Sequence, residues 1–467
     1  MQYVSTRGEA PVLDFPDVLL NGLAGDGGLY LPEVWPRLDD RRIRGLAGLP
    51  YAEAAYRVMR PFVGGSIKDT ALHDIMEAAY ADFRHEAVAP MVQLGPNDWL
   101  LELFHGPTLA FKDVAMQALA RLFDHVLEKR GRHITIVGAT SGDTGSAAIE
   151  AFRGRANCDI FILHPKGRVS EVQRRQMTTV LDENVHNIAI DGSFDDCQAL
   201  VKAMFADAAF RQDVGLAGVN SINWARVMAQ VVYYFTAGVA LGAPARPISF
   251  SVPTGNFGDI FAGYVAAQMG LPIGRLVIAT NANDILKRTF ESGRYDLGEV
   301  HASLSPSMDI QVSSNFERLL FEVYGRDASV VRRLMASLKQ ARGFEVDERE
   351  LAILKTLFAA VRVDDDETIA TIRDVYERTG EILDPHSAVG VAAGSEARGD
   401  GAVPMVHLAT AHPAKFPDAV KKAIGIVPAL PAHLADLFER DERLTELDND
   451  LGAVESFIRA HSRALVD

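Results

Sequence analysis

Segments typical of strands and segments typical of helices alternate along residues 133 to 280. Short apolar runs predict the strands, and longer runs with apolar residues three and four positions apart predict the helices. Strands connected through helices in this way pair in parallel, so the alternation predicts an α/β fold built from βαβ units. The expected strands are 133–139, 159–164, 184–190, 247–252 and 275–280, and the expected helices are 144–152, 170–181, 195–210, 225–241 and 259–269.

The flanking regions are less regular. Residues 1–95 lack the alternation, and we interpret them as an appended N-terminal unit with a helix over 72–83. A polar insertion over 294–315 is followed by expected helices over 317–338, 364–379 and 416–424, a strand over 405–410 and a charged helical tail from residue 428. Ligands of parallel sheets bind beyond the carboxyl ends of the strands, so the loops that follow strands are the candidate sites.

The charge and the cysteine content argue against several classes of protein. A formal net charge of -15 at pH 7 argues against nucleic acid as a partner. Cys158 and Cys197 belong to no CxxC or Cys/His cluster, so we expect no disulfide framework and no metal site, in a cytoplasmic protein. The N-terminus lacks the pattern of a signal peptide, and the apolar segment 227–241 is short for a membrane span, so we expect no membrane association.

Lys112 is the first candidate catalytic residue. It lies in the run FHGPTLAFKD, residues 104–113, just before a helix with a regular apolar face. A lysine held among apolar neighbours has its charged form disfavoured, and its amine becomes nucleophilic near neutral pH, as a Schiff-base lysine requires. The alternative is a lysine that buries its aliphatic stem and extends its ammonium group to water.

Two loops that connect a strand to a helix are suited to bind anions. GATSGDTG, residues 138–145, offers hydroxyls and free backbone N–H groups at a helix N-terminus. Its alternative role is a simple helix N-cap formed by Ser141, Asp143 or Thr144. PTGNFGD, residues 253–259, has two glycines that let backbone amides surround a phosphate before a helix that adds its positive end, although a mere turn is the alternative.

Two further segments carry polar groups at the ends of elements. NSINWAR, residues 220–226, places Arg226 at the start of an apolar helix, where its planar guanidinium matches a phosphate unless an internal ion pair occupies it. TAHPAKF, residues 410–416, ends a strand with Thr410 and His412. A lone histidine is more often a structural hydrogen-bonding group than a catalyst, so the role of His412 stays open. The four segments and Lys112 together indicate a site that binds two phosphates and a carboxylate.

These motifs taken together resemble the threonine synthase family, in the fold-type II group of pyridoxal-phosphate enzymes. The resemblance runs from DGGLYLPE, residues 26–33, to TAHPAKF, and Asp143 fits the long form of the family where related enzymes often have asparagine. It implies two mostly parallel open-sheet domains, a smaller one over 96–215 and a larger one over 216–467, besides the N-terminal unit over 1–95 and the helical C-terminal tail.

The resemblance also implies roles for individual residues. Lys112 would form the Schiff base with pyridoxal 5'-phosphate, Thr410 would hydrogen-bond the pyridine nitrogen, and Asp143 would lie near the cofactor 3′-oxygen. The cofactor phosphate would be bound by the backbone amides of Gly255, Asn256, Phe257, Gly258 and Asp259. The substrate carboxylate would be bound by Thr140, Ser141, Asp143 and Thr144, and the substrate phosphate by Asn220, Arg226 and the Asn256 side chain.

The reaction that the resemblance implies is the conversion of O-phospho-L-homoserine and water to L-threonine and phosphate, the last step of threonine biosynthesis. We expect the enzyme to act as a monomer, with a dimer as the alternative. A pyridoxal-phosphate-dependent serine/threonine dehydratase or phospho-lyase is the alternative function. A hydroxy-amino-acid dehydratase has no substrate phosphate, so Asn220 and Arg226 distinguish the two. A non-catalytic phosphate-binding module is the alternative of another class, and Lys112 argues against it.

Overall fold

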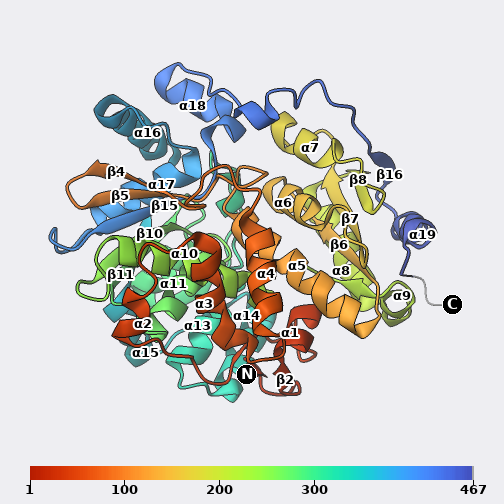
Figure 1. Cartoon of the computed structure of the whole chain (residues 1–467), viewed down its shortest axis with the longest axis horizontal. Helices are drawn as coiled ribbons and strands as arrows, with labels where there is room; N and C mark the ends of the chain where they lie inside the picture. The colour runs from red at the N-terminus through yellow and green to blue at the C-terminus, as the bar shows by residue number, and fades with distance from the viewer. Residues whose placement is uncertain (465–467) are drawn as a thin grey trace.

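The computed structural model describes residues 1–464 and arranges them around two open sheets (Figure 1). The larger sheet has six strands in the order β14 (Phe358–Arg362), β11 (Ile273–Thr280), β10 (Ile248–Pro253), β15 (Met405–Ala409), β5 (Asp98–Glu102) and β4 (Met91–Gly95). The smaller sheet has five strands in the order β16 (Thr445–Asp448), β8 (Val185–Asp191), β7 (Cys158–Pro165), β6 (Ile134–Ala139) and β9 (Leu216–Ala217). All of these strands pair in parallel except β4 with β5, which confirms the predicted α/β fold with two mostly parallel sheets.

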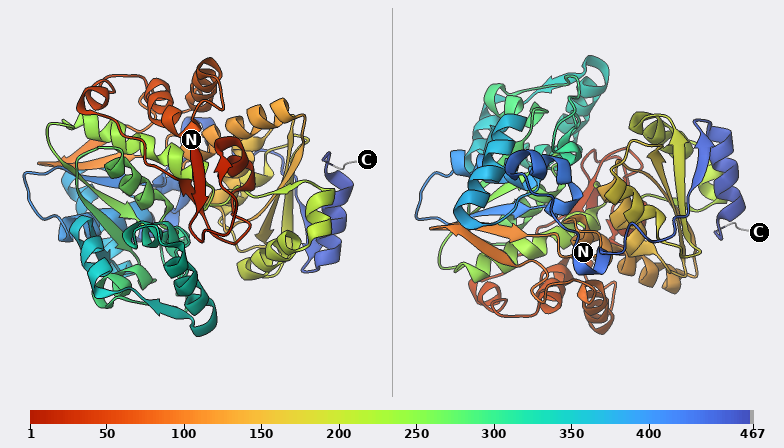
Figure 2. Two further views of the ribbon diagram at one scale, coloured as in Figure 1. Left: turned by 90° about the horizontal axis from the view of Figure 1, so that it is seen from below. Right: turned by 90° about the horizontal axis from the view of Figure 1, so that it is seen from above.

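The two sheets form separate lobes, which lie side by side in both views of Figure 2. The smaller lobe carries α6 (Asp143–Phe152), α7 (Glu171–Thr178), α8 (Phe194–Ala206), α9 (Ala208–Asp213) and α19 (Leu451–His461). The larger lobe carries α11 (Gly258–Gln268), α12 (Ile285–Ser292), α13 (Phe316–Val323), α14 (Ala328–Ala341), α15 (Glu348–Leu357), α16 (Asp365–Thr379), α17 (Pro385–Glu396) and α18 (Pro417–Ile424). Its shorter elements are β12 (Arg294–Asp296), η1 (Pro306–Met308), β13 (Gly343–Glu345), η2 (Pro413–Lys415) and η3 (Ala432–Leu434).

Two long helices, α5 (Lys112–Arg130) and α10 (Trp224–Ala240), form the centre of the molecule and pack against each other. Nearly every side chain of α10 is buried, as its predominantly apolar sequence predicts. The first turn of each helix reaches the junction of the two lobes, so that the residues at these helix starts, Lys112 and Arg226, face a common space.

The N-terminal unit consists of a small antiparallel sheet and four helices. Its elements are β1 (Gln2–Ser5), β2 (Leu13–Asp14), α1 (Phe15–Asn21), β3 (Tyr30–Pro32), α2 (Asp40–Arg44), α3 (Tyr51–Val63) and α4 (Asp69–Tyr80). Helix α3 packs along α10, and Tyr3, Phe15, Phe62 and Trp224 form an aromatic cluster between the N-terminal unit and α10. The N-terminal unit is thus part of the main core and stabilises the helix that carries Arg226.

Sheet membership differs from the expected domain limits in four places. Strand β4 lies within the range 1–95 but pairs with β5 of the larger sheet, and β9 lies within the range 216–467 but pairs with β6 of the smaller sheet. Strand β5 lies within the range 96–215 but pairs with β15 of the larger sheet. Strand β16 lies within the range 216–467 but pairs with β8 of the smaller sheet, and α19 packs on α8 beside it. The pairings of β5 with β15 and of β16 with β8 join segments more than two hundred residues apart, and no local pattern in the sequence indicates them.

Several helices also differ from the expected ranges. The helix expected over 195–210 is broken at Asp207, whose carboxylate accepts hydrogen bonds from the N–H groups of Ala209 and Phe210 and starts α9. The helix expected over 317–338 is broken between α13 and α14, where Arg326 has a φ of 65°. Helix α17 was not predicted, because its small residues show no apolar periodicity. Among the described residues, no helix is both long enough and apolar enough to cross a bilayer.

Candidate active site

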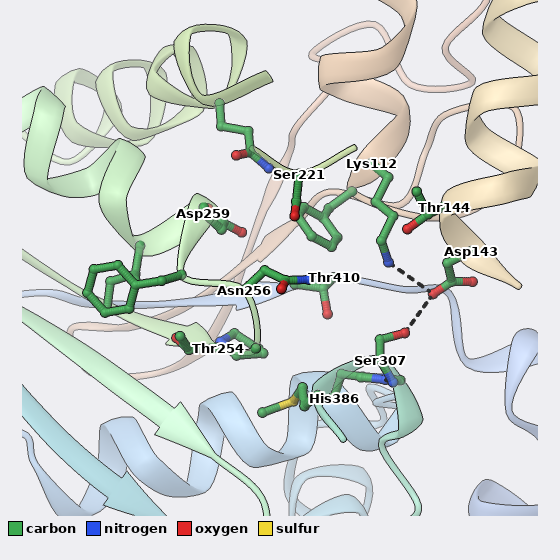
Figure 3. Close-up of a pocket in the computed structure, with 18 of the residues that line it drawn as sticks. Lys112, Asp143, Thr144, Ser221, Thr254, Asn256, Asp259, Ser307, His386 and Thr410 are labelled. Carbon is green, nitrogen blue, oxygen red and sulfur yellow. Dashed lines mark hydrogen bonds and ion pairs between the residues drawn. The ribbon is translucent and has the colours of Figure 1, made fainter. Parts of the chain in front are cut away.

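A cavity lies at the junction of the two lobes, beyond the carboxyl ends of β10 and β15 and beside the N-terminus of α6 (Figure 3). This is the place where ligands of parallel sheets bind. The lining brings together most of the residues that the sequence predicted, from segments far apart in the chain. They are Lys112, Asp143, Thr144, Arg226, Gly255, Asn256, Phe257, Gly258, Asp259 and Thr410.

Lys112 begins α5 and is 91% buried. Its Nζ lies 3.5 Å from Oδ2 of Asp143 and 5.0 Å from the centre of the Phe111 ring. Burial lowers the pKa of Lys112, and the positive charges of Lys415 and Arg226 lower it further against the opposing effect of Asp143. The result is an amine with an increased neutral fraction, as a nucleophilic lysine requires.

The turn before Lys112 is fixed by the buried carboxylate of Asp113. That carboxylate accepts hydrogen bonds from the backbone N–H of Thr108 at 2.8 Å and from its hydroxyl at 2.6 Å. Leu109 adopts a φ of 61° within the turn, and a Cβ at Gly106 would lie 2.4 Å from the Cβ of Asp113. These contacts explain the run FHGPTLAFKD: glycine is required for the close approach, and the aspartate and threonine hold the strained turn that directs Lys112 into the cavity.

Asp143 is the centre of the charged network. Its Oδ1 accepts from Nζ of Lys415 at 2.6 Å and from Nε2 of Gln173 at 2.8 Å. Its Oδ2 faces Nζ of Lys112 and accepts from the hydroxyl of Ser307 at 3.2 Å. Burial by itself raises the pKa of Asp143, but the charges of Lys415 and Lys112 outweigh burial and hold this pKa well below its usual range.

The loop after β10 forms a cradle of backbone groups at the N-terminus of α11. Phe257 has a φ of 63°, in the left-handed region, just before α11 begins at Gly258. A Cβ at Gly255 would lie 3.1 Å from the carbonyl oxygen of Ser307, and one at Gly258 would lie 3.3 Å from Nδ2 of Asn315. Glycine therefore allows the loop to pack closely while its amides and the positive end of the helix face the cavity.

Asp259 lines the cavity, but its carboxylate is hydrogen-bonded to other side chains of the protein core. Its Oδ1 accepts hydrogen bonds from the hydroxyls of Tyr233 at 2.5 Å and Tyr234 at 3.0 Å, while its Oδ2 is buried and has no partner among the described residues. Burial raises the pKa of Asp259 to about 6, and the two tyrosines only partly oppose this.

Arg226 lies in the first turn of α10 and is 96% buried. The guanidinium makes one long hydrogen bond, from Nη1 to the carbonyl oxygen of Val219 at 3.4 Å, and its buried Nε has no partner among the described residues. Burial lowers the pKa of Arg226 to about 10, so it remains charged at neutral pH. A buried, charged and largely unpaired guanidinium is costly unless a ligand satisfies it, and its planar donors match a phosphate.

Three predicted residues do not line the cavity. The hydroxyl of Thr140 accepts from the N–H groups of Gly142 at 3.0 Å and Gly145 at 2.9 Å and so stabilises this loop, whereas the N-cap of α6 is Gly142 and not Ser141, Asp143 or Thr144. Ser141 is exposed. Asn220 is also exposed, and its Oδ1 accepts from the N–H of Ile222 at 3.3 Å.

His412 also lies outside the lining and has a structural contact. Its Nδ1 accepts from the N–H of Ala414 at 3.1 Å and so caps the turn that carries Lys415. Burial lowers the pKa of His412 to about 4, which keeps the ring neutral.

Sequence reasoning missed Lys415, Gln173, Ser307 and His386. Ser307 belongs to the polar insertion, and its N–H donates at 3.1 Å to Nε2 of His386, whose Nδ1 in turn contacts Asp384 at 2.6 Å. The insertion thus supplies one wall of the cavity. Lys415 lies in TAHPAKF, five residues after Thr410, so a lysine next to a predicted site residue was an available signal. Nothing local indicates the other three.

The residues present fit pyridoxal phosphate. The cavity offers a buried amine with a lowered pKa for an aldehyde and a glycine-containing cradle at a helix N-terminus for a phosphate. Within residues 1–464, no three His, Cys, Asp or Glu side chains are grouped so that they could hold a metal ion. The pyridoxal-phosphate dependent enzyme family matches residues 84–334, which include both features. The chain is a pyridoxal-phosphate-dependent enzyme.

Comparisons over the rest of the chain define the family more closely. The family "threonine synthase N terminus" matches residues 2–80, and "threonine synthase, C-terminal" matches residues 387–458. Threonine synthase of Pseudomonas aeruginosa is 60% identical over 462 residues, which cover 99% of this chain and 98% of that protein. The crystal structure of PLP-bound threonine synthase from Brucella melitensis has a TM-score of 0.98 at 61% identity and covers 99% of this chain and 100% of that one. The yeast threonine synthase structure has a TM-score of 0.94 at 41% identity and covers 98% of each chain. The chain belongs to the threonine synthase family.

Proposed function

We propose that this chain converts O-phospho-L-homoserine and water to L-threonine and phosphate. The observation that carries the proposal is Arg226, a buried guanidinium with an unpartnered Nε in the cavity that also holds Lys112. A substrate with an amino-acid group and a terminal phosphate uses both residues. A hydroxy amino acid without a phosphate leaves Arg226 buried and unpaired, which is unfavourable.

The cofactor would be held by three parts of the lining. Lys112 would bond to it through Nζ, and the amides of residues 255–259 with the N-terminus of α11 would bind its phosphate. Thr410, which follows β15, would hydrogen-bond the pyridine nitrogen, and a hydroxyl there would leave that nitrogen largely unprotonated. When bound, pyridoxal phosphate supplies an electron sink for the charge that develops on the substrate carbons.

The substrate would be held between the two lobes. The N-terminus of α6, with Asp143 and Thr144 in its first turn, would receive the α-carboxylate, and Ser141, which lies outside the lining, would contribute from the exposed side of this loop. Arg226 would bind the substrate phosphate with the side chain of Asn256. Thr140 would act indirectly, because its hydroxyl holds the loop by two backbone bonds, and Asn220 would contribute only from the rim.

Lys112 would also carry the protons of the reaction. Its Nζ would take the proton from the substrate α-carbon and later move the proton of the β-carbon, for which a lowered pKa increases the reactive neutral form. Phosphate leaves from the γ-carbon and water adds at the β-carbon, so the products contain every atom of the two reactants.

The test is to incubate the purified enzyme with O-phospho-L-homoserine and measure phosphate together with the organic product. We expect equal amounts of phosphate and L-threonine. Phosphate accompanied by ammonia and a 2-oxo acid would instead indicate a phospho-lyase, and turnover of serine or threonine alone would indicate a dehydratase.

The role of Lys112 has its own test. Borohydride reduction of the enzyme followed by peptide mapping should place the pyridoxyl group on Lys112. Lys415 is the matched control, since it is also buried beside Asp143, and a label on Lys415 would contradict the assignment.

We propose a monomer as the active unit, because a single chain supplies the amine of Lys112, the 255–259 loop and the guanidinium of Arg226 in one cavity. A dimer with two independent sites is the alternative, and sedimentation at assay concentration distinguishes them. A cytoplasmic location agrees with Cys158 and Cys197, both of which are free and buried.

A further inference from the structure

A second buried lysine lies in the active site without an assigned role. Lys415, the last residue of η2, is 99% buried. Its Nζ donates to Oδ1 of Asp143 at 2.6 Å and to the carbonyl oxygen of Thr108 at 2.9 Å. A lysine buried this deeply is found where it is paired, and here the partner is the carboxylate that also faces Lys112.

The two lysines use different oxygens of Asp143. Lys415 binds Oδ1 at the shorter distance, and Lys112 lies 3.5 Å from Oδ2. Both contacts therefore exist at once, and the loss of one leaves the other intact. Because attraction between charges falls with distance, Lys415 is the principal counter-ion of Asp143, and Lys112 is the secondary one.

We propose that Lys415 is a positioning residue that holds Asp143 as a carboxylate, so that Lys112 can lose and regain a proton without leaving that carboxylate unpaired. The inference rests on the proposed role of Lys112 as the cofactor lysine. Without Lys415, Asp143 would have Lys112 as its one cation among the described contacts, and it would retain the proton on Lys112 to a higher pH.

The electrostatic surroundings support the same direction. After burial, the charge of Lys415 is the largest influence on the pKa of Asp143, and Lys415 also contributes to the lowered pKa of Lys112. Other ionisable or polar groups face this pair from each packed element. They are Asp113 from α5, Gln173 from α7, Arg226 from α10, Ser307 from η1, and His386 from α17, whose ring contacts Asp384 just before that helix.

A purely structural role is the competing explanation. Lys415 and Nε2 of Gln176 both donate to the carbonyl oxygen of Thr108, in the turn that precedes Lys112. Loss of this support would lower activity equally at every pH. Loss of the counter-ion would instead shift the pH dependence, so a titration separates the two explanations.

The experiment compares the cofactor-loaded wild type with Lys415→Gln and Lys415→Arg. The cofactor absorbance is titrated with pH, and kcat for O-phospho-L-homoserine is measured over the same range. For Lys415→Gln we expect the midpoint of the absorbance titration, which reports the proton on the Lys112 nitrogen, to rise by about one pH unit or more. We expect kcat at pH 7 to fall about tenfold and to recover at higher pH. Lys415→Arg should keep the midpoint close to that of the wild type. Lys422→Gln, which removes an exposed lysine of α18, is the matched control and should change nothing.

Two further variants keep the test decisive if Lys415→Gln does not fold. Asp143→Asn should move the midpoint in the opposite direction, because the positive charge of Lys415 would then act on Lys112 without a carboxylate. The midpoint of the double variant Lys415→Gln/Asp143→Asn should lie nearer that of the wild type than the midpoint of either single variant does. An unchanged midpoint in folded Lys415→Gln, or an upward shift in Asp143→Asn, would overturn the proposal. Failure of the wild type to form threonine would overturn the proposed function but would leave the absorbance titration interpretable.

Discussion

Two buried arginines of this protein lie close in the fold but differ in how their donors are used. Arg318, in α13, is fully buried, and its Nε and Nη2 donate to the carbonyl oxygen of Tyr30 at 3.0 and 2.8 Å. Its Nη2 also donates to the carbonyl oxygen of Ile222 at 2.7 Å, and its Nη1 to the side chain of Asn315. Arg226 makes a single long bond and has a buried Nε without a partner among the described residues. Burial lowers the pKa of both, to about 9 for Arg318 and about 10 for Arg226.

This difference indicates that the guanidinium of Arg318 stabilises the fold, whereas that of Arg226 is available to bind a ligand. The donors of Arg318 bind acceptors in three segments, which are β3, the 220–226 loop and Asn315 just before α13, so Arg318 holds these segments together. The donors of Arg226 remain available at the cavity surface. Burial and a lowered pKa are common to both residues. The state of the hydrogen-bond donors is what separates them.

The largest effect is expected from Arg318→Ala. The change leaves a large cavity beneath Trp224 and three acceptors without their donor, which should lower the free energy of unfolding by about 3–5 kcal/mol. Urea unfolding measures this loss, and kcat per folded molecule should change much less.

Arg318→Met is the matched variant, since it retains most of the volume but none of the donors. It should lose less stability than Arg318→Ala, because an apolar side chain avoids the cost of burying a charge. A stability equal to that of the wild type in both variants would show that the hydrogen bonds of Arg318 contribute little, and the comparison with Arg226 would fail.

The sequence distinguished these arginines only in part. Arg226 stood out because it lies in a polar motif at the start of a predominantly apolar helix, whereas Arg318 lies in FERLLFEV, where a charged residue indicates an exposed face. Its burial arises from the N-terminal unit, which packs over α13 and has no local relation to it in sequence. The βαβ alternation was likewise readable from local patterns, while the placement of β5 and β16 depends on long-range pairing.

The same distinction applies to the site. Lys112 and the 255–259 loop could be predicted, because strained turns and helix starts have local signatures in glycine, aspartate and hydroxyl residues. The contacts of Ser307 and His386 could not, because they come from segments that reach the cavity only in the folded state. Asn220 was predicted with Arg226 from one motif, yet the turn leaves it exposed.

The second effect is expected from Arg226→Ala. Loss of a charge-assisted contact with the substrate phosphate should reduce kcat/KM about a hundredfold to a thousandfold, equivalent to about 3–4 kcal/mol. The cofactor absorbance and the unfolding free energy should stay near those of the wild type, because the cofactor phosphate is held by the 255–259 loop. Steady-state kinetics beside a cofactor titration measure both.

Arg226→Lys sharpens the comparison, because it keeps the charge but not the planar donors. It should recover only a small part of the loss, since an ammonium group cannot form the paired contact. Near-normal turnover in both variants would show that Arg226 is a structural residue like Arg318, and the dehydratase function would then be favoured.

The third effect concerns Asp259, the acidic counterpart of Arg226, with a buried Oδ2 that has no partner among the described residues. Its folded pKa of about 6 lies above the ordinary value of 3.8, so the folded state binds this proton more tightly than the unfolded state. The contribution of Asp259 to the free energy of unfolding is therefore fully present below about pH 4 and is lost as the pH rises through 6. This loss of stability amounts to no more than about 3 kcal/mol. Urea unfolding from pH 4 to 7 should show a steeper decline in the wild type than in Asp259→Asn, which retains the similar contribution of Asp113. A difference between the two that stays constant with pH would contradict the assignment.

The smallest effect is expected from Asn220→Ala. Asn220 is exposed, and its Oδ1 already accepts the N–H of Ile222 in the turn that leads to Arg226. If the substrate phosphate is bound by Arg226, loss of an amide at the rim should reduce kcat/KM less than about tenfold, and mainly through KM, because a uniform binding contact affects the ground state as much as the transition state.

Asn220→Asp is the informative companion, because it preserves the acceptor for Ile222 but adds a negative charge near the phosphate. It should therefore reduce kcat/KM more than Asn220→Ala does. A hundredfold loss in Asn220→Ala would mean that the loop closes over the substrate and brings Asn220 to the phosphate. The hydrogen-bond donors of Arg226 and Arg318 would then have to be compared in a structure in which this loop is closed.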